Sequence, residues 1–134
     1  MLQKSPSGSL CPYYYMGGEL HPLHYGGFHD NKKCLFEIIK AEEVFILKSP
    51  GNNNRRIWID LYETHLDDEV VVFLLEHLIN IQHKINKFCF VGCSSENKRK
   101  IQMKMKKQNL DLLKQTQYFS DPEDAKRWLI GKLN

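Results

Sequence analysis

The sequence lacks any long, uninterrupted hydrophobic run. Its longest apolar stretch, VVVFLLEHLINI, is broken by Glu76 and His77 and is too short to cross a bilayer. The first fifteen residues, MLQKSPSGSLCPYYY, contain no apolar segment of the kind that a secretory signal peptide needs. We therefore expect a cytoplasmic protein without a transmembrane segment.

Cysteine is scarce as well, and neither sign of charge dominates. Without an export signal, the four cysteines are expected to be reduced thiols rather than disulfides. The formal net charge of +3 is too small to indicate nucleic-acid binding by itself. A hydrophobic content of 42% and a charged content of 26% indicate a folded chain, and 134 residues fit one domain.

Glycine and proline are concentrated in the first 33 residues, where they would interrupt helices and long strands. They include Pro6, Pro12, Pro22, Gly17, Gly18, Gly26 and Gly27. We therefore predict an irregular N-terminal extension over residues 1–33, followed by a domain over residues 34–134. Within the extension, Tyr13 to Tyr15 and Phe28 would cover a sheet edge or an apolar face.

The strand signals begin at Cys34. The run CLFEIIKAEEVFILKSP predicts two short strands, near residues 34–40 and 43–48. IWIDLYE and KFCFVGC are rich in β-branched and aromatic residues and predict two buried strands, and DLLKQTQYF contains the last one.

Helix signals alternate with these strands. One helix is predicted from Asp67 or Asp68 to about Lys84, and a second over SSENKRKIQMKMKKQ. Ser120 and Asp121 can cap a last helix, in which Ala125, Trp128, Leu129 and Leu133 share one face. From residue 57 the order strand, helix, strand, helix, strand, helix predicts an α/β domain with a mostly parallel sheet.

The helix predicted to begin at Asp67 or Asp68 is apolar over more than half of its circumference. A small sheet cannot cover such a helix on all sides, so part of it should face a protein partner or a second copy of the chain, which would form a homodimer. The residues expected to bind the partner are Asp67, Asp68, Glu69, Val70, Phe73, His77 and Ile81.

Three stretches together resemble the STAS domain of bacterial anti-sigma-factor antagonists, especially its SpoIIAA-like branch. They are IWIDLYETHLDDEVVVFLLEHL, KFCFVGCSSENKRKIQMKMKKQNLDLL and YFSDPEDAKRWL, and they span residues 57 to 133. The resemblance implies a STAS-like fold and a small regulatory module without enzymatic chemistry or cofactor. It also implies that the module binds a partner protein or a small apolar or anionic ligand.

The chain departs from that family at the usual phosphorylation site. Matching Asp60 to the Asp that ends the family's strand places the regulatory serine within residues 68–70, where no hydroxyl stands; Thr64 is the nearest. A phosphate would also be repelled by the neighbouring acidic residues. We therefore expect partner binding without this phospho-switch.

The segment CSSENKR supplies an alternative function. Cys93 and Arg99 have the C-x5-R spacing of the cysteine-dependent phosphatases, and Asp121 could act as a general acid. The loop lacks the glycine that would help its N–H groups to surround a phosphate, so we favour anion binding without catalysis. The expected anion-binding residues are Ser94, Ser95, Lys98 and Arg99.

Two other patterns carry weaker hypotheses. Cys11, His21, His24, His29 and Cys34 could supply zinc ligands, but their spacing matches no zinc pattern, and surface histidines are the simpler interpretation. Residues 98–114 carry seven Lys or Arg and one acidic residue, which could attract nucleic acid or a membrane. No aromatic residue lies between the lysines, so we favour a solvated helix face and no nucleic-acid partner.

Overall fold

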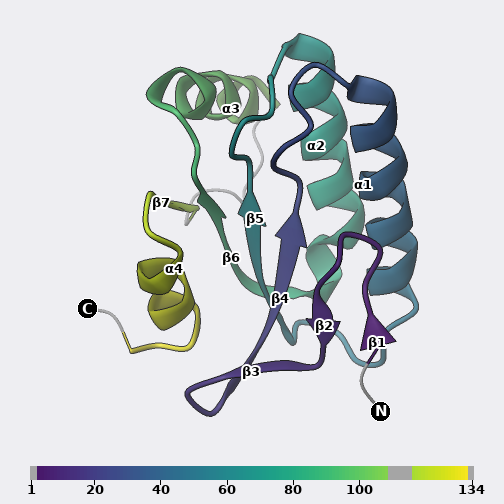
Figure 1. Ribbon diagram of the computed structural model, residues 1–134, viewed down its shortest axis with the longest axis vertical. Coiled ribbons are helices and arrows are strands. Elements are labelled where there is room, and N and C mark those ends of the chain that lie inside the picture. Colours follow the sequence, from purple (N-terminus) through teal and green to yellow (C-terminus); the bar gives the residue numbers. More distant parts are fainter. Residues whose placement is uncertain (1–2, 109–115, 133–134) are drawn as a thin grey trace.

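The computed structural model describes residues 3–108 and 116–132, and it is an α/β fold built on a mostly parallel sheet of five strands (Figure 1). The strands of this sheet are β3 (Tyr13–Tyr15), β4 (Gly18–His24), β5 (Arg55–Asp60), β6 (Ile85–Val91) and β7 (Gln117–Phe119). The helices are α1 (Lys32–Leu47), α2 (Asp68–Ile81), α3 (Ser95–Gln108) and α4 (Pro122–Leu129), with a 3-10 turn at Gln82–Lys84. A separate two-stranded ribbon pairs β1 (Gln3–Lys4) with β2 (Leu10–Cys11).

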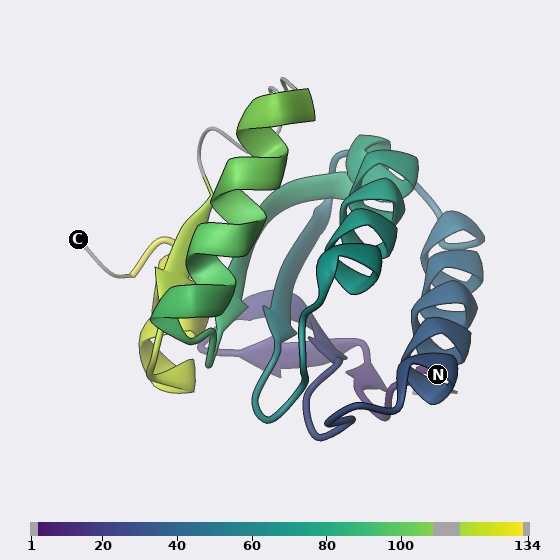
Figure 2. The same cartoon turned by 90° about the horizontal axis from the view of Figure 1, so that it is seen from above.

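The strands lie in the sheet in the same order as in the sequence, from β3 to β7. Strands β4 to β7 are parallel, and β3 joins β4 as an antiparallel hairpin through Met16 and Gly17, whose φ values of 48° and 84° suit a tight hairpin turn. Right-handed crossovers between successive parallel strands place their helices on one face. Figure 2 shows α1, α2 and α3 side by side on that face, with α4 on the other.

Each face of the sheet has its own hydrophobic core. The larger core lies under α1, α2 and α3 and includes Ile39, Ile59, Leu75, Phe90 and Ile101. The smaller core lies under α4 and consists of Leu20, Trp58, Cys89, Val91, Ala125 and Leu129. In addition, the ammonium group of Lys126 lies 5.3, 5.3 and 5.8 Å from the ring centroids of Trp58, Tyr15 and Tyr13, so that cation–π contacts connect α4 to the sheet.

Two predictions about the first half of the chain are wrong. The segment expected to form two strands at 34–40 and 43–48 is the single helix α1. Its buried residues Leu35, Ile39, Glu42 and Ile46 recur at helical spacing, and the side chain of Asn31 caps its start by accepting a hydrogen bond from Cys34 N. The helical spacing and the cap therefore outweighed the β-propensity of the isoleucines and valine.

The N-terminal segment is not irregular, because β4 lies between β3 and β5 in the sheet. Pro22 is tolerated within β4 because β3 pairs only with residues 18–20, which leaves the far edge of β4 unpaired at Pro22. The turn between β1 and β2 is also bound to α1: Ser5 Oγ and Ser7 N donate to the buried carboxylate of Glu42 at 2.7 and 2.8 Å. The segment over residues 3–33 is thus part of the packed structure.

The second half of the chain follows the prediction closely. Strands β5, β6 and β7 and helices α2, α3 and α4 occur in the expected order. Residues 109–115, where the last strand was expected to begin, and Leu133 lie outside the described residues. Over the described ranges, no helix has the length and apolar character required to span a bilayer.

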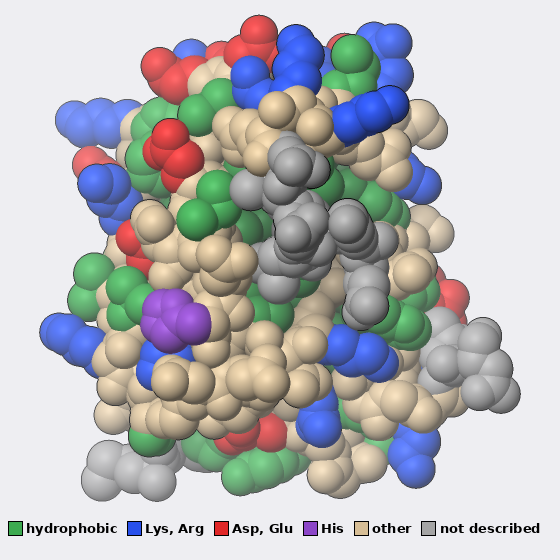
Figure 3. Space-filling view, turned by 180° about the vertical axis from the view of Figure 1, so that it is seen from behind, with side chains coloured by type: hydrophobic (Ala, Val, Ile, Leu, Met, Phe, Trp, Pro, Cys, Tyr) green, Lys and Arg blue, Asp and Glu red, His purple; other side chains and the backbone are tan. Residues whose placement is uncertain are grey.

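Helix α2 is covered more fully than expected, because α1 and α3 flank it. Val70, His77 and Ile81 are buried at 1%, 2% and 0% exposure, so the prediction that they form an outward surface is wrong. Phe73 is half-buried and stacks on Phe36 with ring centroids 4.1 Å apart. On the helix face shown in Figure 3, hydrophobic side chains occur in small separate groups, and Lys and Arg gather toward the end where α3 lies.

Candidate functional site

The carboxyl ends of β4, β5 and β6 meet at one edge of the sheet, which is where parallel α/β sheets usually bind ligands. The residues at these ends are His24, Asp60 and Val91. The loops that follow, together with the start of α3, form the carboxyl edge, which contains Asp67, Cys93, Ser94 and Ser95 among the residues singled out from the sequence.

His24 and Asp60 form a pair at this edge. His24 Nδ1 lies 2.7 Å from Asp60 Oδ2, and Gly26 N donates to the other carboxylate oxygen at 2.8 Å. The two side chains are 42% and 15% exposed. The ring of His24 also lies edge-on to that of Trp58, with centroids 6.3 Å apart. Asp60 therefore fixes the orientation of a histidine that remains accessible to solvent.

Beyond the strand ends, the loops over residues 25–31 and 61–67 are held together by backbone hydrogen bonds. Gly27 N donates to Tyr62 O at 2.6 Å, His29 N to Glu63 O at 2.8 Å, and His65 N to His29 O at 2.8 Å. The buried hydroxyl of Thr64 adds a bond to Tyr25 O at 2.7 Å. The parallel pairing of β4 and β5 thus continues as a rigid platform, which we call the paired loops.

Two residues of the paired loops have a backbone conformation that residues other than glycine rarely adopt. His29 and Glu63 both have φ values of 52°. Such a backbone costs free energy and persists where the surrounding structure enforces it, which often occurs at functional sites. Because both side chains are exposed, the paired loops present them to solvent without burying either.

A hollow of about 370 Å³ lies between the paired loops and the start of α3. Its lining is polar apart from Leu61 and Gly92, and it includes side chains from both loops and from α3. The full lining is His29, Asp30, Leu61, Glu63, Thr64, His65, Gly92, Ser94 and Asn97. The hollow lies outside the carboxyl ends of the parallel strands, the edge at which α/β sheets bind ligands, although the sequential strand order provides no switch point.

The expected anion-binding residues are only partly brought together. Ser94 lines the hollow and caps α3, because its hydroxyl accepts a hydrogen bond from Asn97 N at 3.1 Å. Ser95 is exposed in the first turn of α3. Lys98, however, places its ammonium group 4.9 Å from the ring centroid of Tyr118, and Arg99 is exposed on the helix. The lining of the hollow therefore includes Ser94 at the start of α3 but neither Lys98 nor Arg99.

The arrangement around Cys93 does not favour catalysis. Cys93 is half-buried against the larger core, and burial raises the pKa of its thiol to about 11, although Lys98 acts in the opposite direction. At neutral pH it is therefore a thiol rather than the thiolate that a phosphatase requires. Asp121 caps α4 by accepting from Glu123 N at 2.9 Å, and so already has a structural role.

The proposed zinc ligands are dispersed over the molecule. His21 is buried beside Glu42, with 3.4 Å between Nε2 and Oε1, whereas His24 pairs with Asp60 at the carboxyl edge. His29 lies on the paired loops, Cys34 is exposed on α1, and Cys11 lies in β2. Within residues 3–108 and 116–132, no three His, Cys, Asp or Glu side chains are grouped to hold a metal ion.

The acidic residues at the start of α2 are accessible, as expected. Asp67 caps the helix by accepting from Val70 N at 2.9 Å and pairs with Lys32 Nζ at 2.7 Å. The hydrogen bond from Lys32 lowers the pKa of Asp67. Asp68 and Glu69 are exposed beside it, and Asp68 also lines a small hollow of about 150 Å³ against α3.

The pair of His24 and Asp60 was not expected from the sequence. The sequence indicates His24 only as a possible metal ligand, and it predicts an irregular segment around this residue. The sequence signal for this pair is the short run HPLHY, which has the apolar character of a strand and is followed by two glycines. The strand IWID is likewise followed by a turn. Recognition of this run as a parallel strand would have placed His24 and Asp60 at the same edge.

No protein-family model matches this chain, and comparisons with curated proteins and with solved structures found no match.

Proposed function

We propose that this chain is a non-enzymatic, STAS-like regulatory module that binds a partner protein through the carboxyl edge of its sheet. The resemblance of residues 57–133 to the STAS domain supports this proposal. So does the order of elements from β5 to α4, which agrees with what that resemblance implies. An acid-capped helix begins at Asp68, where the family has its regulatory helix.

The observation that carries the proposal is the rigidity of the paired loops. A binding surface that is already ordered loses little conformational entropy when a partner docks on it. The paired loops have this property, since backbone hydrogen bonds hold them in place and hold His29 and Glu63 in a strained conformation. Neither of these two exposed side chains belongs to a hydrophobic core of the described residues.

The charges around the hollow indicate what a partner must offer. Acidic side chains border it on the paired loops, at Asp30 and Glu63, and continue to Asp68 and Glu69 at the start of α2. Helix α3 on the other side is basic, with Glu96 as its single acidic residue. A partner should therefore present basic groups to the paired loops and acidic groups to the first turns of α3 beside the hollow, whereas Lys106 is in the last turn of that helix.

The test is affinity capture from an extract of the source cells with the immobilised chain and two charge-reversal variants. Glu63→Lys changes the paired loops, and Lys106→Glu changes an exposed position on α3 outside the hollow. We expect a protein that the wild type and Lys106→Glu retain and that Glu63→Lys loses. Equal retention by all three would contradict the proposal, provided that circular dichroism shows the variants folded.

Native mass spectrometry separates a heterologous partner from self-association. If the wild type is a dimer and Glu63→Lys is a monomer, then the partner at this edge is a second copy of the chain. A dimer unaffected by Glu63→Lys, together with no captured protein, would place the functional surface elsewhere and overturn the proposal.

A further inference from the structure

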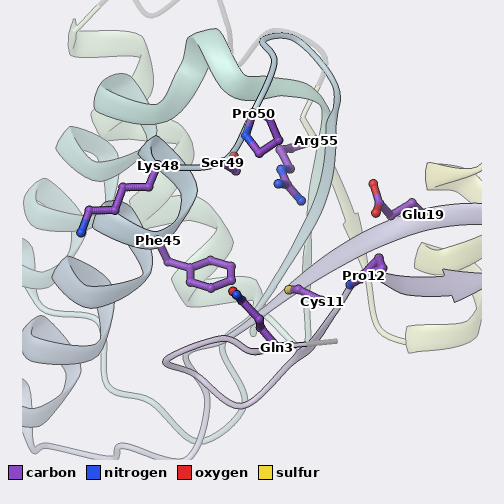
Figure 4. Close-up of a pocket in the computed structure, with 9 residues that line it drawn as sticks. All are labelled: Gln3, Cys11, Pro12, Glu19, Phe45, Lys48, Ser49, Pro50 and Arg55. Carbon is purple, nitrogen blue, oxygen red and sulfur yellow. The ribbon is translucent and has the colours of Figure 1, made fainter. Parts of the chain in front are cut away.

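Another hollow lies at the opposite end of the sheet from the carboxyl edge. It has a volume of about 530 Å³ and lies between the end of α1, strand β2 and the amino ends of β4 and β5 (Figure 4). We call it the amino-end pocket. It is lined by Gln3, Cys11, Pro12, Glu19, Phe45, Lys48, Ser49, Pro50 and Arg55. Its volume is in the range of pockets that bind small molecules.

Arg55 supplies the charge inside the amino-end pocket. Figure 4 shows its guanidinium group directed from the start of β5 into the space between Pro50, Phe45 and Cys11. Its Nε atom is buried and has no hydrogen-bond partner among the described residues. A buried N–H of a charged group without a partner is costly, and a bound anion would satisfy it.

Phe45 supplies a flat apolar surface. Its ring is half-buried but belongs to neither hydrophobic core of the sheet. Its recorded aromatic contact is the edge-on ring of His21, with centroids 5.7 Å apart. Figure 4 shows the ring extending into the pocket from α1, so it is available to stack on a ligand.

The walls of the pocket are held in place by the surrounding structure. The buried side chain of Lys84 donates to Ser49 O and Gly51 O, each at 2.7 Å. Asn53 N donates to His83 O at 2.8 Å, so the segment between α1 and β5 is anchored at several points. Pro12 and Pro50 add stiffness on either side. The pocket therefore exists before any ligand enters it.

The charged side chains that line the pocket favour an anionic ligand over a cationic one. Among the described residues that line the pocket, Lys48 and Arg55 are the cations and Glu19 is the one acidic residue. Lys48 directs its amine away from the centre of the pocket, whereas the guanidinium of Arg55 points toward it (Figure 4). A planar guanidinium binds carboxylate or phosphate oxygens through two parallel hydrogen bonds.

We propose that the amino-end pocket binds a small molecule that carries a carboxylate or phosphate group on a flat ring. The anion bonds to the guanidinium of Arg55, and the ring stacks on Phe45. This site is independent of the carboxyl edge, because it uses the opposite end of the sheet and shares none of its lining residues.

The test uses 2-naphthoate and 2-naphthyl phosphate as probes, with uncharged 2-naphthamide as a matched control. Binding is followed by ¹H–¹⁵N NMR of the full chain. We expect both anions, or one of them, to shift the amides of Cys11, Phe45, Ser49 and Arg55, and to bind at least ten-fold more tightly than the amide. The stronger of the two identifies the preferred anionic group.

Two neighbouring arginines provide the control variants. Arg55→Gln should weaken the preferred anion at least ten-fold, whereas Arg56→Gln, whose side chain lies on the opposite face of β5, should change affinity less than two-fold. If Arg55→Gln does not fold, Arg55→Lys keeps the charge but loses the planar fork, and should still weaken binding several-fold. The proposal would be overturned if the anions and the amide bind with equal affinity, or if the amide resonances that shift belong to residues outside the pocket. It would also be overturned if Arg55→Gln and Arg56→Gln change the affinity equally.

Discussion

His24 Nδ1 and Asp60 Oδ2 lie 2.7 Å apart, and this contact joins the last residues of two adjacent parallel strands. The two residues are also partners in the strand register. Since Asp60 in addition accepts the Gly26 N–H, it orients both the end of β4 and the beginning of the paired loops.

Asp60→Asn should destabilise the chain by about 1–2 kcal/mol, because an amide replaces the carboxylate that accepts from both partners. The measurement is urea unfolding followed by circular dichroism. Asp30→Asn is the control, since Asp30 is exposed and its carboxylate is in no hydrogen bond or ion pair with another described residue. A loss below about 0.5 kcal/mol, similar to that of the control, would show that the pair contributes little.

Phe73→Ala should cost about 2 kcal/mol of stability, because it removes a half-buried ring that stacks on Phe36. Met103→Ala is a control on α3, where the side chain is 55% exposed, and should change stability by less than about 0.5 kcal/mol. The measurement is again urea unfolding. An unchanged midpoint for Phe73→Ala, with altered oligomeric state, would instead make Phe73 part of an interface.

Stability should fall as the pH decreases below about 6.5, because of His77. His77 is buried and bonds to Tyr25 Oη at 2.8 Å and Glu43 Oε1 at 2.9 Å. Burial lowers its pKa, although Glu43 acts in the opposite direction. The unfolded chain therefore binds a proton near pH 6.5 that the folded chain does not, and the stabilisation present above that pH is lost as the pH falls.

The measurement is the urea midpoint between pH 5 and 8 for the wild type and His77→Gln. The variant should show a smaller slope, by at most about 1.4 kcal/mol per pH unit. Glu42 does not interfere in this window. Burial alone would raise its pKa, but the nearby His21 ring and the hydrogen bonds from Ser7 and Ser5 lower it overall, so its contribution is lost only at more acidic pH. Identical slopes for both proteins would contradict the assignment to His77.

Iodoacetamide at pH 7.5 should modify Cys34 first. Cys34 is exposed on α1, whereas burial raises the pKa of Cys93 to about 11 and that of Cys89 to about 12. Because the thiolate is the reactive form, Cys93 and Cys89 should both react far more slowly in the native protein. Peptide mass spectrometry gives the order, and modification in urea provides the fully reactive reference. Rapid labelling of Cys93 would restore the phosphatase alternative.

Lys126→Met should destabilise the chain by about 1 kcal/mol, since it removes the cation that α4 places among Tyr13, Tyr15 and Trp58. Methionine keeps most of the length of the side chain, so the effect isolates the charge. Lys106→Met, at an exposed position on α3, is the control. Thermal unfolding of the two variants compares them directly, and equal midpoints would show that these contacts are energetically neutral.

The sequence predicts the second half of the fold better than the first, for physical reasons. In α2 the apolar residues recur at helical spacing after a capping Asp67, and in α4 Asp121 and Pro122 mark the start. In α1 the isoleucines and valine have high β-propensity, so the sequence favours strands there. Propensity alone cannot show that Glu42 accepts hydrogen bonds from a serine-rich turn far away in the sequence.

The sites depend even more on tertiary contacts. Cys93 and Arg99 match a catalytic spacing, but the sequence could not show that burial keeps the thiol protonated. Neither the pair of His24 and Asp60 nor the amino-end pocket comes from residues close together in the chain. Arg55 and Phe45 become neighbours only when β5 takes its place in the sheet beside α1.

The strand order from β3 to β7 has a consequence for how the chain folds during synthesis. Each parallel strand pairs with the strand made just before it, so none must wait for a later segment before it can dock. A ribosome releasing the chain from its N-terminus would deliver β4, then β5, then β6 to an edge that is already formed. Such an order keeps each parallel pairing as close in sequence as one intervening helix allows, which limits the time for which an unpaired edge is exposed to other chains.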